Sequence, residues 1–186
     1  MNEWENFLGK KKNEDVQHAA SWAPPPAEFI KINVDASFKE ATKSGGWGVL
    51  GRDSSSVLCV AAAGPLEQIS DAMHAEACAL SNAIQIADQM GMGRVIFETD
   101  CLNLKHAMTT SDYYYSPIGN LISDLKFRLH LNFIEARVSY APRICNKPAH
   151  ELAALGVGGN HSVQCIWTEN FPNSVTRPVT DELVVS

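Results

Sequence analysis

The apolar periodicity of this chain changes near residue 71, and this change constrains the fold more than any other feature. Before it, three segments alternate or run apolar, as in "FIKINVDASF" at 29–38, "WGVLGRD" and "VLCVAAAG", which predicts three strands at hairpin spacing. From 71 to 91 the apolar positions recur every three or four residues, which predicts an amphipathic helix that ends at Gly91. Strands followed by a long helix indicate a sheet with a helix crossing it.

The later segments continue the alternation of strand and helix. A strand is predicted at 94–100 and another at 132–141, with helices at 101–108, 116–130 and 147–156. Ser116 opens the second of these helices, with Pro117 at its first position. The predicted fold class is therefore α/β, with a five-stranded mixed sheet in the order βββαβααβα, antiparallel at first and parallel after the crossover.

Composition and breaker residues divide the chain into four predicted regions. Residues 1–21 lack apolar periodicity and are expected to form a disordered arm, although "KKK" at Lys10–Lys12 leaves a nuclear-localisation patch as the alternative. The Pro-rich stretch 22–29 leads into the domain, because consecutive prolines impose extended geometry. The domain itself spans 30–158. Residues 159–186 are expected to form a C-terminal tail, either draped on the domain or disordered.

Charge and cysteine usage exclude several classes of protein. The net charge of −6 argues against a strongly basic nucleic-acid binder. The five cysteines are widely spaced and lack a CxxC pair, which indicates free thiols in a reducing compartment. No apolar run is long enough to span a bilayer, and the polar start does not resemble a signal peptide. We therefore expect an intracellular protein of the nucleus or cytoplasm without a membrane partner. The sequence leaves the oligomeric state open, with a monomer as the expectation.

One carboxylate lies on the inward stripe of the helix at 71–91. Glu76 falls among apolar positions of that stripe, where an unpartnered charge would cost several kcal/mol. It therefore needs a cation, a partner or a raised pKa. The apolar members of the stripe are Met73, Leu80, Ala83, Ile84 and Ala87.

Two other acids have simple structural explanations when taken singly. Asp35 belongs to the polar set of a half-buried strand, where a solvated face would explain it. Asp100 ends a strand and precedes a helix, where it could serve as an N-cap. Taken together, the first and fourth strands can be neighbours, with Glu76 above both acids. Three converging carboxylates repel one another unless a divalent cation neutralises them, and all-oxygen ligation suits Mg²⁺ or Mn²⁺.

The segments that carry these acids, "KINVDAS", "HAEACAL" and "FETD", resemble the Asp–Glu–Asp core of type 1 ribonuclease H. More narrowly, "WAPPP", "PRICNKPAHELAALG" and "WTENFP" resemble the plant ribonuclease H-like domains at the end of non-LTR retrotransposon reverse transcriptases. The resemblance covers about residues 22–175. It implies an endonuclease that cleaves the RNA strand of RNA–DNA hybrids by two-metal hydrolysis.

The resemblance also implies a role for each site residue. Asp35 would bridge two Mg²⁺ ions, with Mn²⁺ as an alternative, and Glu76 and Asp100 would hold the ion that activates water. The family places a fourth acid at the start of the last helix, where this chain has His150. A neutral imidazole is a poor Mg²⁺ ligand, so His150 is either a weak ligand of the second ion or a polar residue without a catalytic part.

Other departures support a second hypothesis. Met73 and Leu102 stand where hybrid-binding members of the family have amide side chains, and the basic handle of bacterial and animal enzymes has no counterpart. The alternative is a catalytically weak or inactive domesticated module that binds nucleic acid or a protein partner.

Two other motifs are expected to be structural. "GGWG" at 45–48 lacks the lysine of a phosphate-binding loop. The tyrosines at 113–115 are expected to pack on the sheet edge rather than to stack on bases.

Overall fold

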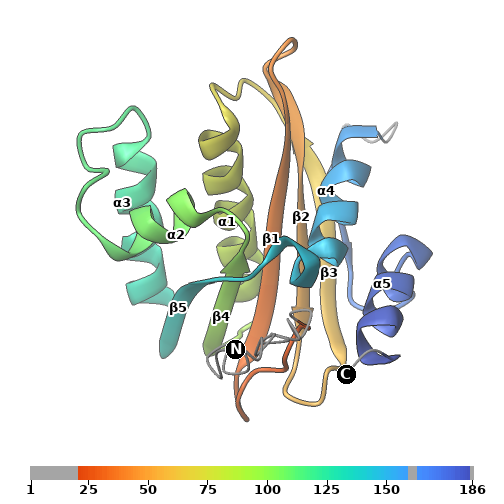
Figure 1. Cartoon of the computed structure of the whole chain (residues 1–186). Helices are drawn as coiled ribbons and strands as arrows, with labels where there is room; N and C mark the ends of the chain where they lie inside the picture. The colour runs from red at the N-terminus through yellow and green to blue at the C-terminus, as the bar shows by residue number, and fades with distance from the viewer. Residues whose placement is uncertain (1–20, 159–162, 185–186) are drawn as a thin grey trace, which may run out of the picture.

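The computed structural model describes residues 21–158 and 163–184, and a six-stranded mixed sheet forms its centre (Figure 1). The strand order is β5-β4-β1-β2-β3-β6. β1 pairs with β2 and β2 with β3 in antiparallel fashion, whereas β4 is parallel to both β1 and β5. The strands are β1 (Ile30–Lys39), β2 (Ser44–Arg52), β3 (Leu58–Leu66), β4 (Arg94–Thr99), β5 (Glu135–Tyr140) and β6 (Cys165–Trp167).

Helices cover both faces of the sheet. α1, α2 and α3 lie on one side, and α4 and α5 on the other, as Figure 1 shows. The larger core lies between α1–α3 and the sheet, and a smaller one lies beneath α4 and α5. The helices are α1 (Ala72–Gln89), α2 (Leu102–Thr109), α3 (Gly119–Asn132), α4 (Lys147–Gly158) and α5 (Asn173–Val184), with a 3₁₀ turn η1 (Arg143–Cys145) before α4.

The strand count predicted from the sequence is wrong by one. β6 is only three residues long and pairs antiparallel with β3, from Ala61↔Trp167 to Ala63↔Cys165. So short a segment carries no readable alternation, which is why the sequence pattern missed it. The region expected as a tail also contributes α5, whose Val175 and Val179 are buried against Leu50 and Leu152.

β1 is buried on both faces rather than half-buried as predicted. Its apolar set, including Ile32 and Val34, faces the larger core. Its polar set includes Asn33 (0% exposed) and Asp35 (2% exposed), because α4 covers that face. Alternation shows which residues share a face, but not whether a second layer covers it. The solvated-face explanation for Asp35 is therefore wrong.

Two glycines of β2 allow α4 to lie directly on the sheet. A Cβ added to Gly48 would come 2.2 Å from the Ala149 carbonyl oxygen, and one added to Gly46 would come 2.4 Å from that of Ala153. Backbone atoms cannot move aside as a flexible side chain can, so only glycine permits this approach. The glycines of the "GGWG" motif thus allow α4 to pack closely on β2. The motif lies within a strand, as the sequence predicted.

Helix starts differ from the prediction at two places. Asp71 caps α1 by accepting a hydrogen bond from the His74 N–H at 2.8 Å, and the helix ends just before Gly91, which has a positive φ of 69°. α2 is capped by Cys101, so Asp100 is not the N-cap. α3 begins at Gly119, because Ser116 and Pro117 belong to the preceding turn.

The Pro-rich lead-in packs against the domain through Trp22. Its side chain is buried beside Ala141 and Cys145, and the guanidinium carbon of the fully buried Arg52 lies 3.4 Å from the centre of its ring. The Lys31 ammonium donates to the Ala23 carbonyl at 2.6 Å. The lead-in therefore contacts the sheet and the chain just before α4.

Three remaining expectations concern the surface and the ends of the chain. Tyr113 packs against the core, but Tyr115 is fully exposed and Tyr114 half-exposed, so the prediction that all three tyrosines pack on the sheet edge is wrong. None of the described helices is long and apolar enough to cross a membrane. The predicted arm, apart from residue 21, lies outside the described residues, as do 159–162 and 185–186 of the predicted tail.

Candidate metal centre

The parallel pairing of β1 and β4 brings two aspartates side by side. Val34 pairs with Thr99 in this register, and Asp35 and Asp100 are the residues that follow them. β4 ends at Thr99, and the Thr99 hydroxyl accepts a hydrogen bond from the Cys101 N–H at 3.0 Å, which turns the chain into α2. Asp100 is therefore held at the carboxyl end of its strand, next to Asp35.

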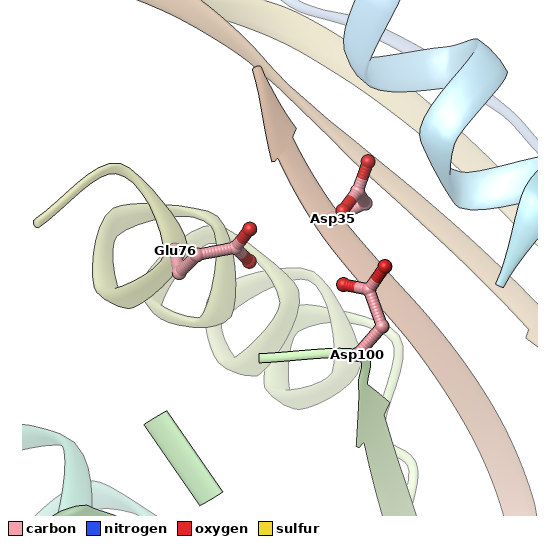
Figure 2. Close-up of side chains that lie close together, drawn as sticks. All are labelled: Asp35, Glu76 and Asp100. Carbon is pink, nitrogen blue, oxygen red and sulfur yellow. The ribbon is translucent and has the colours of Figure 1, made fainter. Parts of the chain in front are cut away.

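Glu76 reaches the same point from α1. It lies in the second turn of the helix, whose first turn is fixed by the Asp71 cap. The helix packs on β1, and the backbone N–H of Ala36 hydrogen-bonds to the Glu76 carboxylate. Figure 2 shows the Glu76 side chain extended toward Asp35 and Asp100. The inward glutamate of the sequence thus faces two other acids, as predicted.

The three acids form one compact group of oxygen ligands. One ligand atom from each of Asp35, Glu76 and Asp100 lies within 4.8 Å of the other two. Asp35 is buried, whereas the other two are partly accessible, so the group opens to solvent on one side. Among the described residues, no other set of three or more His, Cys, Asp or Glu side chains meets this test. The site is therefore compact, acidic and reachable.

Burial and mutual repulsion raise the pKa of two of these acids. The pKa of Glu76 rises from 4.5 to about 9, chiefly because burial penalises the charged form and then because the Asp35 and Asp100 charges repel it. The pKa of Asp35 rises from 3.8 to about 6, chiefly through burial, while the hydrogen bond from His150 opposes that rise. Both shifts show that the neighbouring protein groups do not supply enough positive charge to neutralise the three carboxylates.

The residues fit a divalent cation. The Glu76 Oε2 atom is buried and has no hydrogen-bond partner among the described residues, and the side chain that carries it points toward two other carboxylates. Hard oxygen donors of this kind are the usual ligands of Mg²⁺ and Mn²⁺. A bound cation would satisfy the orphaned oxygen and neutralise the repulsion that raises both pKa values.

His150 contacts Asp35 but does not belong to the group of three ligand residues. Its Nδ1 lies 2.7 Å from the Asp35 Oδ2, and its side chain is 41% exposed. The position depends on the close packing of α4, since Gly48 pairs with Asp35 across the strands and contacts Ala149. The two residues are 115 positions apart in the sequence, so the contact is a product of the tertiary fold.

Arg143 is a site residue that the sequence analysis missed. Its guanidinium Nη2 lies 3.3 Å from the His150 Nε2, and its Nη1 lies 3.9 Å from the Asp100 Oδ2. The segment "PRICNKPAH" contains it, but nothing in that segment shows that an exposed arginine in a short 3₁₀ turn faces a strand end 43 positions earlier. Met73 and Leu102 occupy the two positions where hybrid-binding members of the family have amide side chains. In this structure Met73 packs against the core, and Leu102 is 60% exposed.

Buried amides fix the segment that carries Arg143 and His150. The Asn146 side chain is fully buried and donates to the Val34 carbonyl at 3.0 Å, one residue before Asp35. Asn33 donates to the Cys145 carbonyl at 3.4 Å. Both bonds connect β1 with the end of η1, so the turn and the start of α4 are held against the strand that carries Asp35.

Solved structures of ribonucleases H share this architecture. The structure of LC11-RNase H1, isolated from compost, superposes with a TM-score of 0.64 at 18% identity, over 70% of this chain and 96% of that one. The N-terminal RNase H domain of Rv2228c from Mycobacterium tuberculosis gives 0.60 at 16% identity, over 69% and 92%. RNase H1 of Halobacterium salinarum gives 0.58 at 16%, over 69% and 96%. The fold is that of a type 1 ribonuclease H.

A protein-family model assigns the chain more narrowly. The model described as "Reverse transcriptase-like" matches residues 33–156, which include all three acids, Arg143 and His150. The chain therefore belongs to the reverse transcriptase-like family. No curated protein sequence matches it. The narrower resemblance to plant retrotransposon domains stays a prediction.

Proposed function

We propose that this protein is a metal-dependent endonuclease that cleaves the RNA strand of RNA–DNA hybrids. The observation that carries the proposal is the convergence of Asp35, Glu76 and Asp100 to within 4.8 Å, with a buried oxygen of Glu76 left unpartnered. A site kept only for stability would gain nothing from clustered, repelling carboxylates. LC11-RNase H1, with the same fold, is described in complex with an RNA/DNA hybrid, which supports this class of ligand.

Each acid has a distinct part in the proposed site. Asp35 is the most buried of the three and is fixed by β1, so it is the rigid ligand. Glu76 and Asp100 complete the set from α1 and from the end of β4. When bound, Mg²⁺ or Mn²⁺ would supply Lewis-acid stabilisation of the phosphate and a water of lowered pKa. The role of the protein is to hold the three oxygens at a site open to a nucleic-acid strand.

A labelled RNA–DNA hybrid tests this directly. We expect the hybrid to be cut with Mg²⁺ or Mn²⁺, because both ions accept ligation by carboxylate oxygens. Asp35→Asn should abolish the activity while leaving the fold intact, because the amide keeps the shape but loses the charge. Hybrid left uncut by folded wild-type protein at high concentration, in both metals, would refute the proposal.

A binding module without nuclease activity is the second candidate. One observation favours it: Asp35 already has a protein partner, since His150 bonds to one of its oxygens at 2.7 Å. Such a module would bind nucleic acid or a protein partner in the nucleus or cytoplasm, with the acids as an inheritance. Retention of hybrid on wild-type protein without cleavage, unchanged in Asp35→Asn, would support this candidate instead.

A further inference from the structure

The hydrogen bonds around His150 determine which of its ring nitrogens carries the proton. Arg143 Nη2 lies 3.3 Å from Nε2, and a guanidinium can only donate, so Nε2 is the acceptor. The ring proton of the neutral imidazole is then on Nδ1, which donates to the Asp35 Oδ2 at 2.7 Å. With one nitrogen accepting and the other donating, His150 has no lone pair left to bind a metal.

The same arrangement places a fixed positive charge beside the acids. The guanidinium of Arg143 lies 3.9 Å from the Asp100 Oδ2 as well as against His150, and its charge opposes the rise in the pKa of both Asp35 and Glu76. Glu76 reaches the group from α1 on one face of the sheet, and His150 reaches it from α4 on the other. One oxygen of Asp35 is thus occupied by a hydrogen bond from the α4 side.

We propose that the site holds a single divalent ion, bound by Asp35, Glu76 and Asp100, and that His150 and Arg143 together fill the position of a second ion. In this arrangement His150 is a positioning residue that orients Asp35. Arg143 supplies positive charge next to the remaining ion, on a side chain that is 71% exposed and accessible to a phosphate. The inference rests on the proposed function, because it specifies how many ions the proposed metal site binds and which side chains take the place of the second ion.

Counting bound ions tests the inference separately from activity. The full chain is titrated with Mn²⁺ in the presence of a phosphorothioate RNA–DNA hybrid, and bound Mn²⁺ is counted by electron paramagnetic resonance, with the ions held by the hybrid alone subtracted. We expect one ion for the wild type. His150→Asp replaces the donor by a carboxylate and should bind two ions. His130→Asp makes the same change on the exposed surface of α3 and should stay at one.

The outcomes separate the inference from the proposed function. Two ions on the wild type, or one ion on both the wild type and His150→Asp, would overturn the inference while leaving the nuclease proposal in place. No bound ion would overturn both. One ion on the wild type, two on His150→Asp and no cleavage by either would support the inference and refute the proposed function.

A second variant serves if His150→Asp fails to fold. Arg143→Ala removes an exposed side chain and should preserve the fold. Because it removes a positive charge beside Asp100, the dissociation constant for Mn²⁺ should fall several-fold, and more at low than at high salt. An unchanged dissociation constant would show that Arg143 does not act on the ion and would overturn the inference.

Discussion

Glu76 shows how burial and function oppose each other within one residue. Its carboxylate is drawn inward by α1, where burial and two neighbouring acids raise its pKa to about 9. At neutral pH and without metal it therefore carries a proton. The same geometry that makes the charged form costly makes the site attractive to a divalent cation, because the cation stabilises the ionised form.

Metal binding should therefore release a proton. At pH 7 the ion must displace the proton of Glu76, whereas Asp35, with a pKa of about 6, is already mostly ionised. We expect the affinity for Mn²⁺ to rise about tenfold per pH unit between pH 7 and 9. Calorimetry in two buffers of different ionisation enthalpy measures the proton count, with Glu76→Gln as the control that releases none. An affinity independent of pH would contradict this.

Replacing Glu76 by glutamine should stabilise the metal-free protein at alkaline pH. The pKa of Glu76 is raised on folding, so the contribution of this residue to stability is full below pH 4.5 and is lost as the pH rises toward 9. Glutamine cannot ionise, so the Glu76→Gln variant does not lose this stability as the pH rises. The melting temperature of Glu76→Gln should exceed that of the wild type at pH 8 to 9, and the difference should shrink as the pH falls. A constant difference across this range would argue against the raised pKa.

At the scale of the elements, the contact between β2 and α4 sets the position of His150. Gly46 and Gly48 remove the side chains that would hold the helix away from the sheet. Asp35 pairs with Gly48 across the strands, and Ala149, the residue before His150, lies against that glycine. A contact between two backbones, rather than a side-chain attraction, therefore brings the imidazole to the acid.

Gly48→Ala should separate α4 from the sheet. The added methyl would lie 2.2 Å from the Ala149 oxygen and 2.4 Å from the Ala153 nitrogen, so the helix must shift. We expect a loss of about 2 kcal/mol or more in the free energy of unfolding, together with loss of the His150–Asp35 contact. Gly93→Ala is the control, since its methyl would meet only the flexible end of Ile134, at 3.0 Å. Denaturant unfolding compares the two, and equal midpoints would refute the argument.

At the scale of the whole molecule, the lead-in belongs to the folded unit although the sequence separated it from the domain. Trp22 is 7% exposed and covers the fully buried Arg52, whose Nη2 donates to Asn33 at 3.0 Å. Asn33 in turn donates to Glu98, which forms a 3.0 Å ion pair with Lys31. Buried charges persist only when paired in this way. Trp22 of the lead-in covers Arg52, a member of this network. It also packs against Cys145, at the end of the turn that carries Arg143.

Trp22→Ala should destabilise the whole domain. Removing a buried tryptophan costs about 3 kcal/mol or more, and here it also uncovers the guanidinium of Arg52. Because Ala141 and Cys145 lose their packing partner, hybrid cleavage should fall as well. Tyr115→Ala truncates a fully exposed aromatic side chain and should change the free energy of unfolding by less than about 0.5 kcal/mol. Equal stability of the two variants in thermal melts would show that the lead-in is not part of the fold.

Periodicity and residue type alone determined the α/β class and the place of the three acids on their elements, because these depend on patterns local to each element. The sequence allowed the first and fourth strands to be neighbours, and the tertiary structure decided that they are. Only the tertiary structure decided that Asp35 is buried on the face under α4, that His150 donates to it, and that Arg143 joins them. The sixth strand, too, was fixed by pairing with β3 rather than by its own three residues. Alternation specifies the face to which a side chain belongs. What covers that face is specified by segments more than a hundred positions away.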